Sequence, residues 1–152
     1  DFDVMRDAGA MLGSGGIIVG NQEKCAVDLA RVLVAFCQYE SCGKCFPCRL
    51  GMTNLLDFVE RIARFEGKEE DLKLMDRVGK TMEAGSLCFH GQLGYNPLRS
   101  ALVNFETDFR IHLEENRCPT ESCLNPLHVP KNTRPFGENF KPAAELVQLS
   151  HL

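Results

Sequence analysis

Three of the eight cysteines in this 152-residue sequence fall within seven consecutive positions, in the stretch "ESCGKCFPCRLG" at residues 40–51. Cys42, Cys45 and Cys48 follow one another at three-residue spacing. Thiolates are soft ligands that select zinc, copper(I) or iron–sulfur clusters. A C-x2-C-x2-C run can wrap one corner of a cubane cluster, which needs a fourth thiolate. The spacing therefore predicts a metal centre with one further ligand elsewhere in the chain.

The fourth ligand does not follow directly, because Met52 stands where the bacterial two-cluster ferredoxin run has its fourth cysteine. We expect the ligand to be Cys88, in "GSLCFHGQLG" at residues 85–94, which lies between the third and fourth predicted helices. In an up-and-down bundle, this loop and the loop between the first two helices lie at the same end. We refer to Cys42, Cys45, Cys48 and Cys88 as the four-cysteine group.

Four amphipathic helices are predicted to position these residues, because apolar side chains recur at helical spacing. Pro47 suits the first turn of the second helix, and Asn96 followed by Pro97 predicts the capped start of the fourth. The predicted helices cover residues 25–39, 47–67, 69–85 and 96–113. Short connections between them predict a mainly α protein, with a compact four-helix bundle over residues 25–116.

The two flanks of the predicted bundle differ from it in composition. Residues 1–24 form a glycine-rich linker in which the apolar run 17–19 predicts a short strand. Its glycines do not fit the G-x-G-x-x-G phosphate-binding pattern. Residues 117–152 hold five of the seven prolines and lack helical periodicity. We expect an extended tail there, ordered only against a neighbour.

Zinc is the alternative occupant of the four-cysteine group, since four thiolates bind this ion well. Zinc sites usually pair two ligands with two, whereas three close ligands and one remote ligand are typical of a [4Fe-4S] cluster. The backbone around Gly43 and the side chains of Lys44 and Arg49 could offset the negative charge of a cubane. A cluster predicts electron transfer, whereas zinc would make the bundle a structural assembly module without redox activity.

A second set of metal-ligand types is spread along the chain. Cys118 and Cys123 form a C-x4-C pair beyond the bundle. The first helix starts and the fourth finishes at the end away from the cluster loops, so Cys25 and His112 are expected near this pair. Three cysteines and one histidine are a regular ligand set for structural zinc. In the other interpretation, the pair are tail thiols or a disulfide and Cys25 is a small core hydrophobe.

Composition excludes several classes of protein. The net charge of −4 gives no reason to expect a nucleic-acid partner. No apolar run is long enough for membrane insertion, and the opening residues do not form a secretory signal. We expect a cytoplasmic protein, or one at the cytoplasmic face of a membrane-associated complex. Because the sequence starts at Asp1 without an initiator methionine, we also expect a piece of a longer polypeptide.

The stretch "ESCGKCFPCRLG" resembles the E-S-C-G-x-C-x-P-C-R-x-G signature of the NADH-binding flavoprotein subunit of respiratory complex I. Relatives in NAD-linked hydrogenases and formate dehydrogenases share this signature. "GSGGIIV" and "SLCFHGQLG" resemble the elements on either side of it, so the resemblance covers roughly residues 1–115. It implies a helical bundle that binds one [4Fe-4S] cluster through Cys42, Cys45, Cys48 and Cys88.

The resemblance also implies a role, in which the cluster exchanges single electrons between a flavin mononucleotide reduced by NADH and iron–sulfur clusters in partner subunits. The family's flavin-binding domain lies upstream of the signature. We therefore expect FMN and NAD(H) to bind only in a missing upstream domain, and we expect no catalytic residue in this segment. Phe89 and His90 depart from the small or aliphatic residues expected after the last cysteine.

Overall fold

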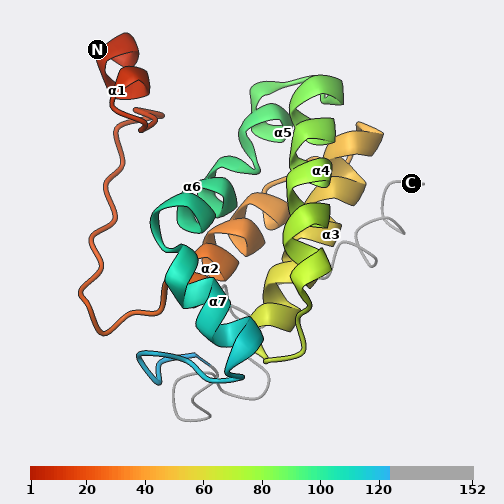
Figure 1. The fold of residues 1–152 in the computed structure, drawn as a ribbon. Helices are drawn as coiled ribbons and strands as arrows, with labels where there is room; N and C mark the ends of the chain where they lie inside the picture. The colour runs from red at the N-terminus through yellow and green to blue at the C-terminus, as the bar shows by residue number, and fades with distance from the viewer. Residues whose placement is uncertain (124–152) are drawn as a thin grey trace.

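The computed structural model describes residues 1–123 and is helical throughout its regular elements (Figure 1). Its helices are α1 (Phe2–Asp7), α2 (Ala26–Tyr39), α3 (Phe46–Ala63), α4 (Glu69–Gly85), α5 (Phe89–Leu93), α6 (Asn96–Asn104) and α7 (Glu106–Glu114). The prediction of a mainly α protein is confirmed. None of the helices in residues 1–123 is both long enough and apolar enough to cross a membrane.

The first three predicted helices correspond to α2, α3 and α4. Pro47 lies in the first turn of α3, where its missing N–H costs no helical hydrogen bond. α3 ends four residues before the predicted stop at Gly67, because Phe65 takes a left-handed conformation with φ 61°. Asp71 then fixes the start of α4: its carboxylate accepts from the Lys68 N–H at 2.9 Å and from Arg61 on α3 at 2.6 Å.

The fourth predicted helix is divided, and this is a correction. α6 ends at Asn104 and α7 begins at Glu106, with Phe105 between them at φ −131° and ψ 36°. Asn96 is the first residue of α6 rather than its cap, and Tyr95 holds the cap position without a side-chain hydrogen bond. Apolar periodicity does not detect the break, because both halves turn buried side chains toward the same core.

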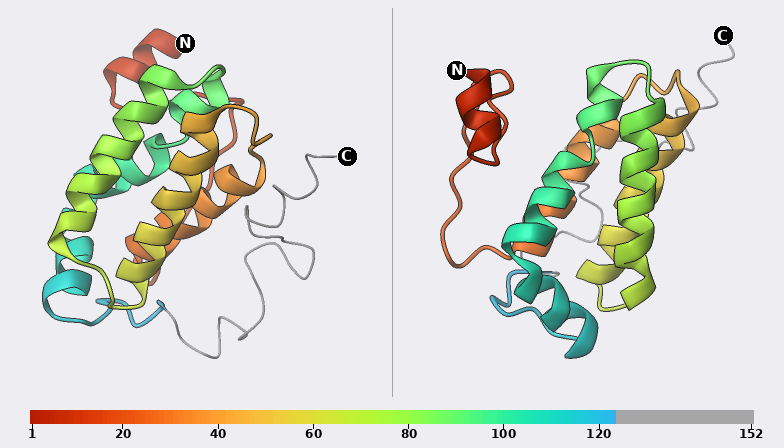
Figure 2. Two further views of the ribbon diagram at one scale, coloured as in Figure 1. Left: turned by 90° about the vertical axis from the view of Figure 1, so that its right-hand side faces the viewer. Right: turned by 45° about the horizontal axis from the view of Figure 1, so that its top comes forward.

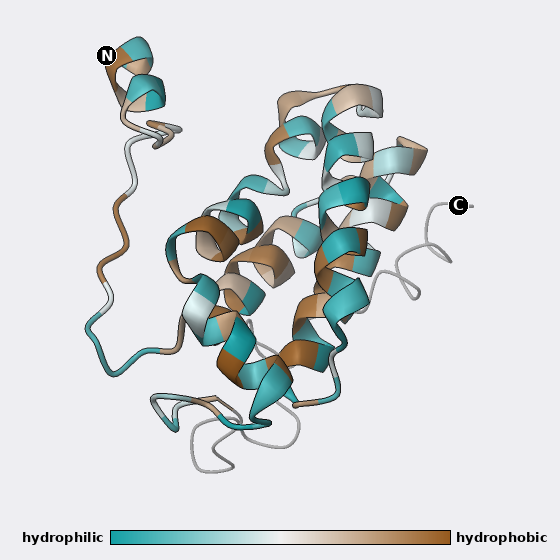
Figure 3. Cartoon of the chain, viewed as in Figure 1, coloured by the Kyte–Doolittle hydropathy of each residue, from teal (hydrophilic) through white to brown (hydrophobic). Residues whose placement is uncertain are grey.

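The predicted strand at residues 17–19 does not form. These three side chains are exposed on an extended segment that descends beside the bundle, visible as the brown stretch in Figure 3. A strand needs a neighbouring strand to satisfy its backbone groups, and residues 1–123 contain none. Only residues 117–123 of the predicted tail fall among the described residues, so residues 124–152 lie outside the structural account.

The bundle is held together by contacts of two central helices. α2 packs against α3 and α6, α3 packs against α4, and α7 contacts the ends of α2 and α3. The fully buried core side chains include Val27, Val34, Met52, Leu55, Val59, Ile62, Met75, Met82, Leu98 and Phe109. The α2–α3 and α4–α5 loops meet at one end of this core, whereas α7 and residues 117–123 lie at the other (Figure 2). Each end carries one of the two predicted sets of ligands.

Candidate metal centres

The α2–α3 loop carries three members of the four-cysteine group. Gly43 takes φ 68°, a left-handed conformation that glycine adopts without steric cost, and its N–H donates to the Ser41 Oγ at 3.3 Å. Cys45 occupies the N-cap position of α3 and Cys48 follows in its first turn. The Ser41 Oγ lies 3.3 Å from the Cys48 Sγ. This turn therefore places the three cysteines around the N-terminus of α3.

The α4–α5 loop brings Cys88 to the same end. Cys88 is the N-cap of α5, and Gly91 packs where a side chain would not fit. A Cβ at residue 91 would lie 2.6 Å from Ser86 and 2.9 Å from the Cys48 Cβ. The His90 Nε2 donates to the Cys37 carbonyl at 2.8 Å, which fastens α5 to the last turns of α2. His90, a departure from the expected pattern, thus has a structural partner.

The thiols of the two loops influence one another. Burial raises the pKa of the Cys48 thiol, although the Ser41 hydroxyl works in the opposite direction. The other three members of the four-cysteine group raise this pKa further by repulsion between thiolates. The backbone N–H of Leu87 donates to the Cys45 sulfur and lowers the pKa of that thiol. With the close approach of Gly91 to Cys48, these interactions place the thiols of both loops at the same end of the bundle.

The surroundings fit a thiolate-bound, negatively charged group. The buried Ser86 hydroxyl lies beside the Cys45 sulfur and helps to lower the pKa of that thiol, so it is placed to donate to a sulfur. At the N-terminus of α3 the Cys48 backbone N–H donates to the Cys45 sulfur, and the helix dipole adds a partial positive charge. The Arg49 side chain reaches back over the loop, with its Nη1 3.5 Å from the Gly43 carbonyl oxygen. Cys42 and Cys88 are exposed, so this end opens onto the surface.

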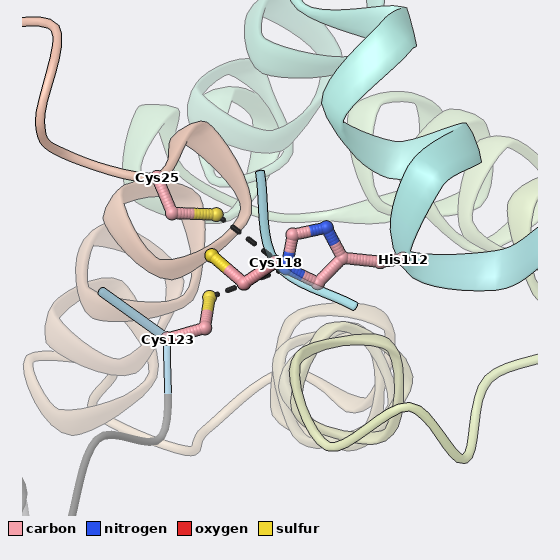
Figure 4. A group of neighbouring side chains, drawn as sticks. All are labelled: Cys25, His112, Cys118 and Cys123. Atoms are coloured by element: carbon pink, nitrogen blue, oxygen red, sulfur yellow. Dashed lines mark hydrogen bonds between the residues drawn. The ribbon is translucent and has the colours of Figure 1, made fainter. Parts of the chain in front are cut away.

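The second predicted set of ligands converges at the opposite end of the bundle (Figure 4). We refer to Cys25, His112, Cys118 and Cys123 as the Cys3His group. Their ligand atoms all lie within 4.8 Å of one another, and no member is more than 8% exposed. The His112 Nε2 lies 3.6 Å from the Cys25 Sγ and 3.3 Å from the Cys123 Sγ. Within residues 1–123, this is the one group of three or more metal-binding side chains with ligand atoms so close together.

Hydrogen bonds orient the members of the Cys3His group. The His112 Nδ1 donates to the Asp108 carbonyl at 2.7 Å, which leaves the Nε2 lone pair facing the sulfurs. The Cys25 N–H donates to the Ser122 Oγ at 3.0 Å, and the Ala26 N–H donates to the Asp108 carboxylate at 3.3 Å. The segment after α7 is thereby folded over the N-terminus of α2.

The thiols of this group differ in acidity. A hydrogen bond from Cys123 is the largest influence on Cys25; it outweighs burial and lowers the pKa of this thiol to about 5. The pKa of Cys123 is raised, because its proton is held in the hydrogen bond to Cys25 and its side chain is buried. Of this pair, Cys25 is therefore the thiol that loses its proton more readily. All eight cysteines of the chain are free thiols in the structure.

Some polar residues at the two ends were not predicted from the sequence. Ser41 and Ser86 each stand next to a ligand loop, but serine in a loop is too common to carry a signal by itself. Asp108 precedes His112 by one helical turn, so its backbone carbonyl can accept from the imidazole. That four-residue spacing is a usable signal, because a metal-binding histidine needs a second partner on its other nitrogen.

Comparison with known proteins agrees with this geometry. The chain is 40% identical over 119 residues to an NADH-quinone oxidoreductase subunit of Rhizobium meliloti, covering 78% of this chain and 28% of that protein. It is 30% identical over 123 residues to the NADP-reducing hydrogenase subunit HndC of Solidesulfovibrio fructosivorans, covering 81% and 25%. The chain thus spans about a quarter of the length of the curated relatives it matches.

Solved structures and family models give the same result. An NAD+-reducing [NiFe]-hydrogenase in the H2-reduced state superposes with a TM-score of 0.65 at 26% identity, covering 74% of this chain and 19% of that chain. The model of the NADH-ubiquinone oxidoreductase-F iron-sulfur binding region matches residues 28–112, which is more than half of the chain. The chain therefore belongs to the family of the NADH-ubiquinone oxidoreductase-F iron-sulfur binding region.

Proposed function

We propose that this chain is an electron-transfer module that binds one [4Fe-4S] cluster through the four-cysteine group. When bound, such a cluster accepts and donates single electrons. The observation that carries the proposal is the contact between the α2–α3 and α4–α5 loops. The backbone N–H of Leu87, the residue before Cys88, reaches the Cys45 sulfur. Membership of an iron–sulfur binding family supports the choice of cofactor.

The chain's own residues would hold this cluster and tune its charge. The hydroxyls of Ser41 and Ser86 and the N–H of Leu87 lie where they can donate to sulfur. Hydrogen bonds to the sulfurs stabilise the more negative, reduced form and so raise the reduction potential. Exposure of Cys42 and Cys88 keeps the cofactor near the surface, which suits electron exchange with another protein.

The partners we propose follow from the named relatives, which are subunits of an NADH-quinone oxidoreductase and of an NADP-reducing hydrogenase. The module would relay electrons between an NADH-reduced FMN site and partner iron–sulfur subunits. The FMN and NADH site would lie in a domain outside residues 1–152. The exposed apolar side chains of Phe46, Leu87 and Phe89 surround the cysteine loops and suit a protein partner there. We propose a cytoplasmic location, or the cytoplasmic face of a membrane-associated complex.

The alternative function is a four-cysteine zinc site that only holds an assembly module together. The sulfurs of the four-cysteine group do not lie as close together as ligand atoms that enclose a single ion. This wider spacing favours the cluster over zinc. In a cubane, each of the four thiolates binds a different iron.

Analysis of iron, sulfide and zinc in anaerobically purified protein tests the proposal. We expect about four iron and four sulfide per chain. Cys88→Ser should lose most of this iron. Cys37→Ser is the matched control, because Cys37 is half-buried near the same loops but is not a proposed ligand. Zinc bound at the four-cysteine group without any iron would establish the alternative.

A further inference from the structure

The Cys3His group has no part in the proposed electron transfer, yet it is the more enclosed of the two donor sets. Its side chains come from the N-cap of α2, from α7 and from the segment after α7 (Figure 4). We propose that this group binds one structural zinc ion, which fastens residues 117–123 to the N-terminus of α2. This inference goes beyond the electron-transfer function and does not depend on it.

Distances within the group match the edges of a zinc tetrahedron. Zn–S bonds of about 2.3 Å and a Zn–N bond of about 2.0–2.1 Å place neighbouring ligand atoms about 3.6–3.8 Å apart. The two distances from the His112 Nε2, 3.6 Å to the Cys25 Sγ and 3.3 Å to the Cys123 Sγ, are close to these edges. Small side-chain movements therefore suffice to enclose one ion. A ligand set of three sulfurs and one nitrogen excludes calcium and magnesium, which prefer oxygen.

His112 also makes the hydrogen bond that a metal-bound histidine requires on its other ring nitrogen. Metal-binding imidazoles donate their other N–H to a carbonyl or carboxylate, which fixes the ring and its tautomer. The His112 Nδ1 makes this bond to the Asp108 carbonyl at 2.7 Å. Cys25 stands at the N-terminus of the 14-residue α2, where the helix dipole favours a thiolate. That dipole would also offset the net negative charge of a zinc ion bound by three thiolates.

Other occupants of the group explain less of the geometry. A disulfide would use two sulfurs and leave the third thiol and the histidine lone pair directed at the same point without a partner. An iron–sulfur cubane would not fit, because ligand atoms within 4.8 Å of one another leave no room for its sulfides. One tetrahedral ion uses all four donors, and four-coordinate sites of three thiolates and one imidazole are typical of structural zinc.

The proposed ion has a structural task in the fold. Residues 117–123 form no helix, and the turn around them places Asn116 at φ 51° and Glu121 at φ 54°. Non-glycine residues pay a conformational cost at such angles. The segment is nevertheless held over α2, with Cys118 and Cys123 as its buried side chains. Binding of zinc would offset the cost of ordering this segment, since the free energy of metal binding contributes to folding.

Zinc analysis and zinc-edge X-ray absorption of the purified chain test the proposal. We expect about one zinc per chain, with three sulfur neighbours at about 2.3 Å and one nitrogen at about 2.0–2.1 Å. Iron does not contribute to this spectrum, so the result is independent of the cluster. Absence of zinc would overturn the proposal. A spectrum with sulfur neighbours alone would also overturn it, because such a zinc ion would lie in the four-cysteine group.

Variants separate the two centres. The double variant Cys118→Ser/Cys123→Ser should lower the zinc content at least tenfold while most of the iron remains. Cys42→Ser should lower the iron content and leave the zinc in place. Zinc retained in the double variant would overturn the proposal. If the double variant does not fold, the spectrum of the unchanged chain still decides. If the chain gives the zinc spectrum with three sulfur neighbours and one nitrogen but contains no iron–sulfur cluster, only the electron-transfer proposal is refuted.

Discussion

Gly91 on α5 lies so close to Cys48 on α3 that a Cβ at residue 91 would come within 2.9 Å of the Cys48 Cβ. The same Cβ would lie 2.6 Å from Ser86. Backbone contact at this point holds the loop of Cys88 against the loop of the other three cysteines. The glycine therefore connects the sequence pattern to the assembly of the proposed cluster.

The first prediction concerns Gly91→Ala. Alanine favours a helix over glycine by about 1 kcal/mol, so any loss must come from the contact. Overpacking at such a contact typically costs about 1–3 kcal/mol. We expect a lower melting temperature and less iron per chain, because α5 moves away from Cys48. Gly16→Ala is the control, since a Cβ at residue 16 has nothing within 4 Å. Equal iron contents in the two variants would show that the contact does not matter.

The second prediction concerns the turn at Gly43. A Cβ there has space, with its nearest neighbour, the Arg49 Cδ, at 3.9 Å, so only the positive φ opposes a side chain. Gly43→Ala should destabilise the fold by about 1–2 kcal/mol, as a left-handed conformation costs an L-residue. Gly43→Asn should cost less, because asparagine tolerates this region. Chemical denaturation measures both, and an equal or larger loss for asparagine would contradict the explanation.

Much of the fold could be predicted because helices have a strong local signal. Apolar spacing and Pro47 located α2, α3 and α4 within a few residues. The divided fourth helix could not be predicted, because the break at Phe105 leaves the periodicity of Leu98 and Phe109 intact. The strand at residues 17–19 was wrongly predicted because strand formation depends on a partner strand, which local sequence does not reveal.

The two donor sets show what topology adds to motif spacing. Bundle topology placed Cys88 beside the C-x2-C-x2-C loop, and the structure puts them at the same end. The same argument brought Cys25 and His112 together with the C-x4-C pair, which no local pattern indicates. Hydrogen-bond partners such as Ser41 and Ser86 lie in loops, where serine is too common to carry a signal, so they emerge only from coordinates.

The third prediction concerns Asp71, whose carboxylate links the start of α4 to α3. It is buried and accepts from the Lys68 N–H and from Arg61. Asp71→Asn removes the charge of two charge-assisted hydrogen bonds and should lower the free energy of unfolding by about 2 kcal/mol. Glu70→Gln is the matched control on the exposed face of the same turn and should change it by less than about 0.5 kcal/mol. Denaturant titration compares the two, and similar losses would refute the assigned role.

The fourth prediction concerns removal of the proposed zinc. Loss of the ion should release residues 117–123 and expose the first amides of α2. The N–H groups of Cys25 and Ala26 bond to Ser122 and Asp108 in the structure. Hydrogen exchange of these amides should accelerate at least tenfold in Cys118→Ser/Cys123→Ser.

The core of α3 supplies the internal reference for this experiment. Leu55 and Val59 are fully buried and lie in the interior of the helix, away from both of its ends. Their amides should exchange at nearly unchanged rates in the double variant, which distinguishes local release from global unfolding. Unchanged exchange at Cys25 and Ala26 would show that the segment is held without the ion.

The central claim is that four sulfurs, three from the α2–α3 loop and one from Cys88, hold one iron–sulfur cluster. Anomalous diffraction at the iron absorption edge, from crystals grown without oxygen, tests it most directly. We predict a single iron peak with the Sγ atoms of the four-cysteine group around it. An iron peak that Cys88 does not contact, or zinc in place of iron at that position, would contradict the claim.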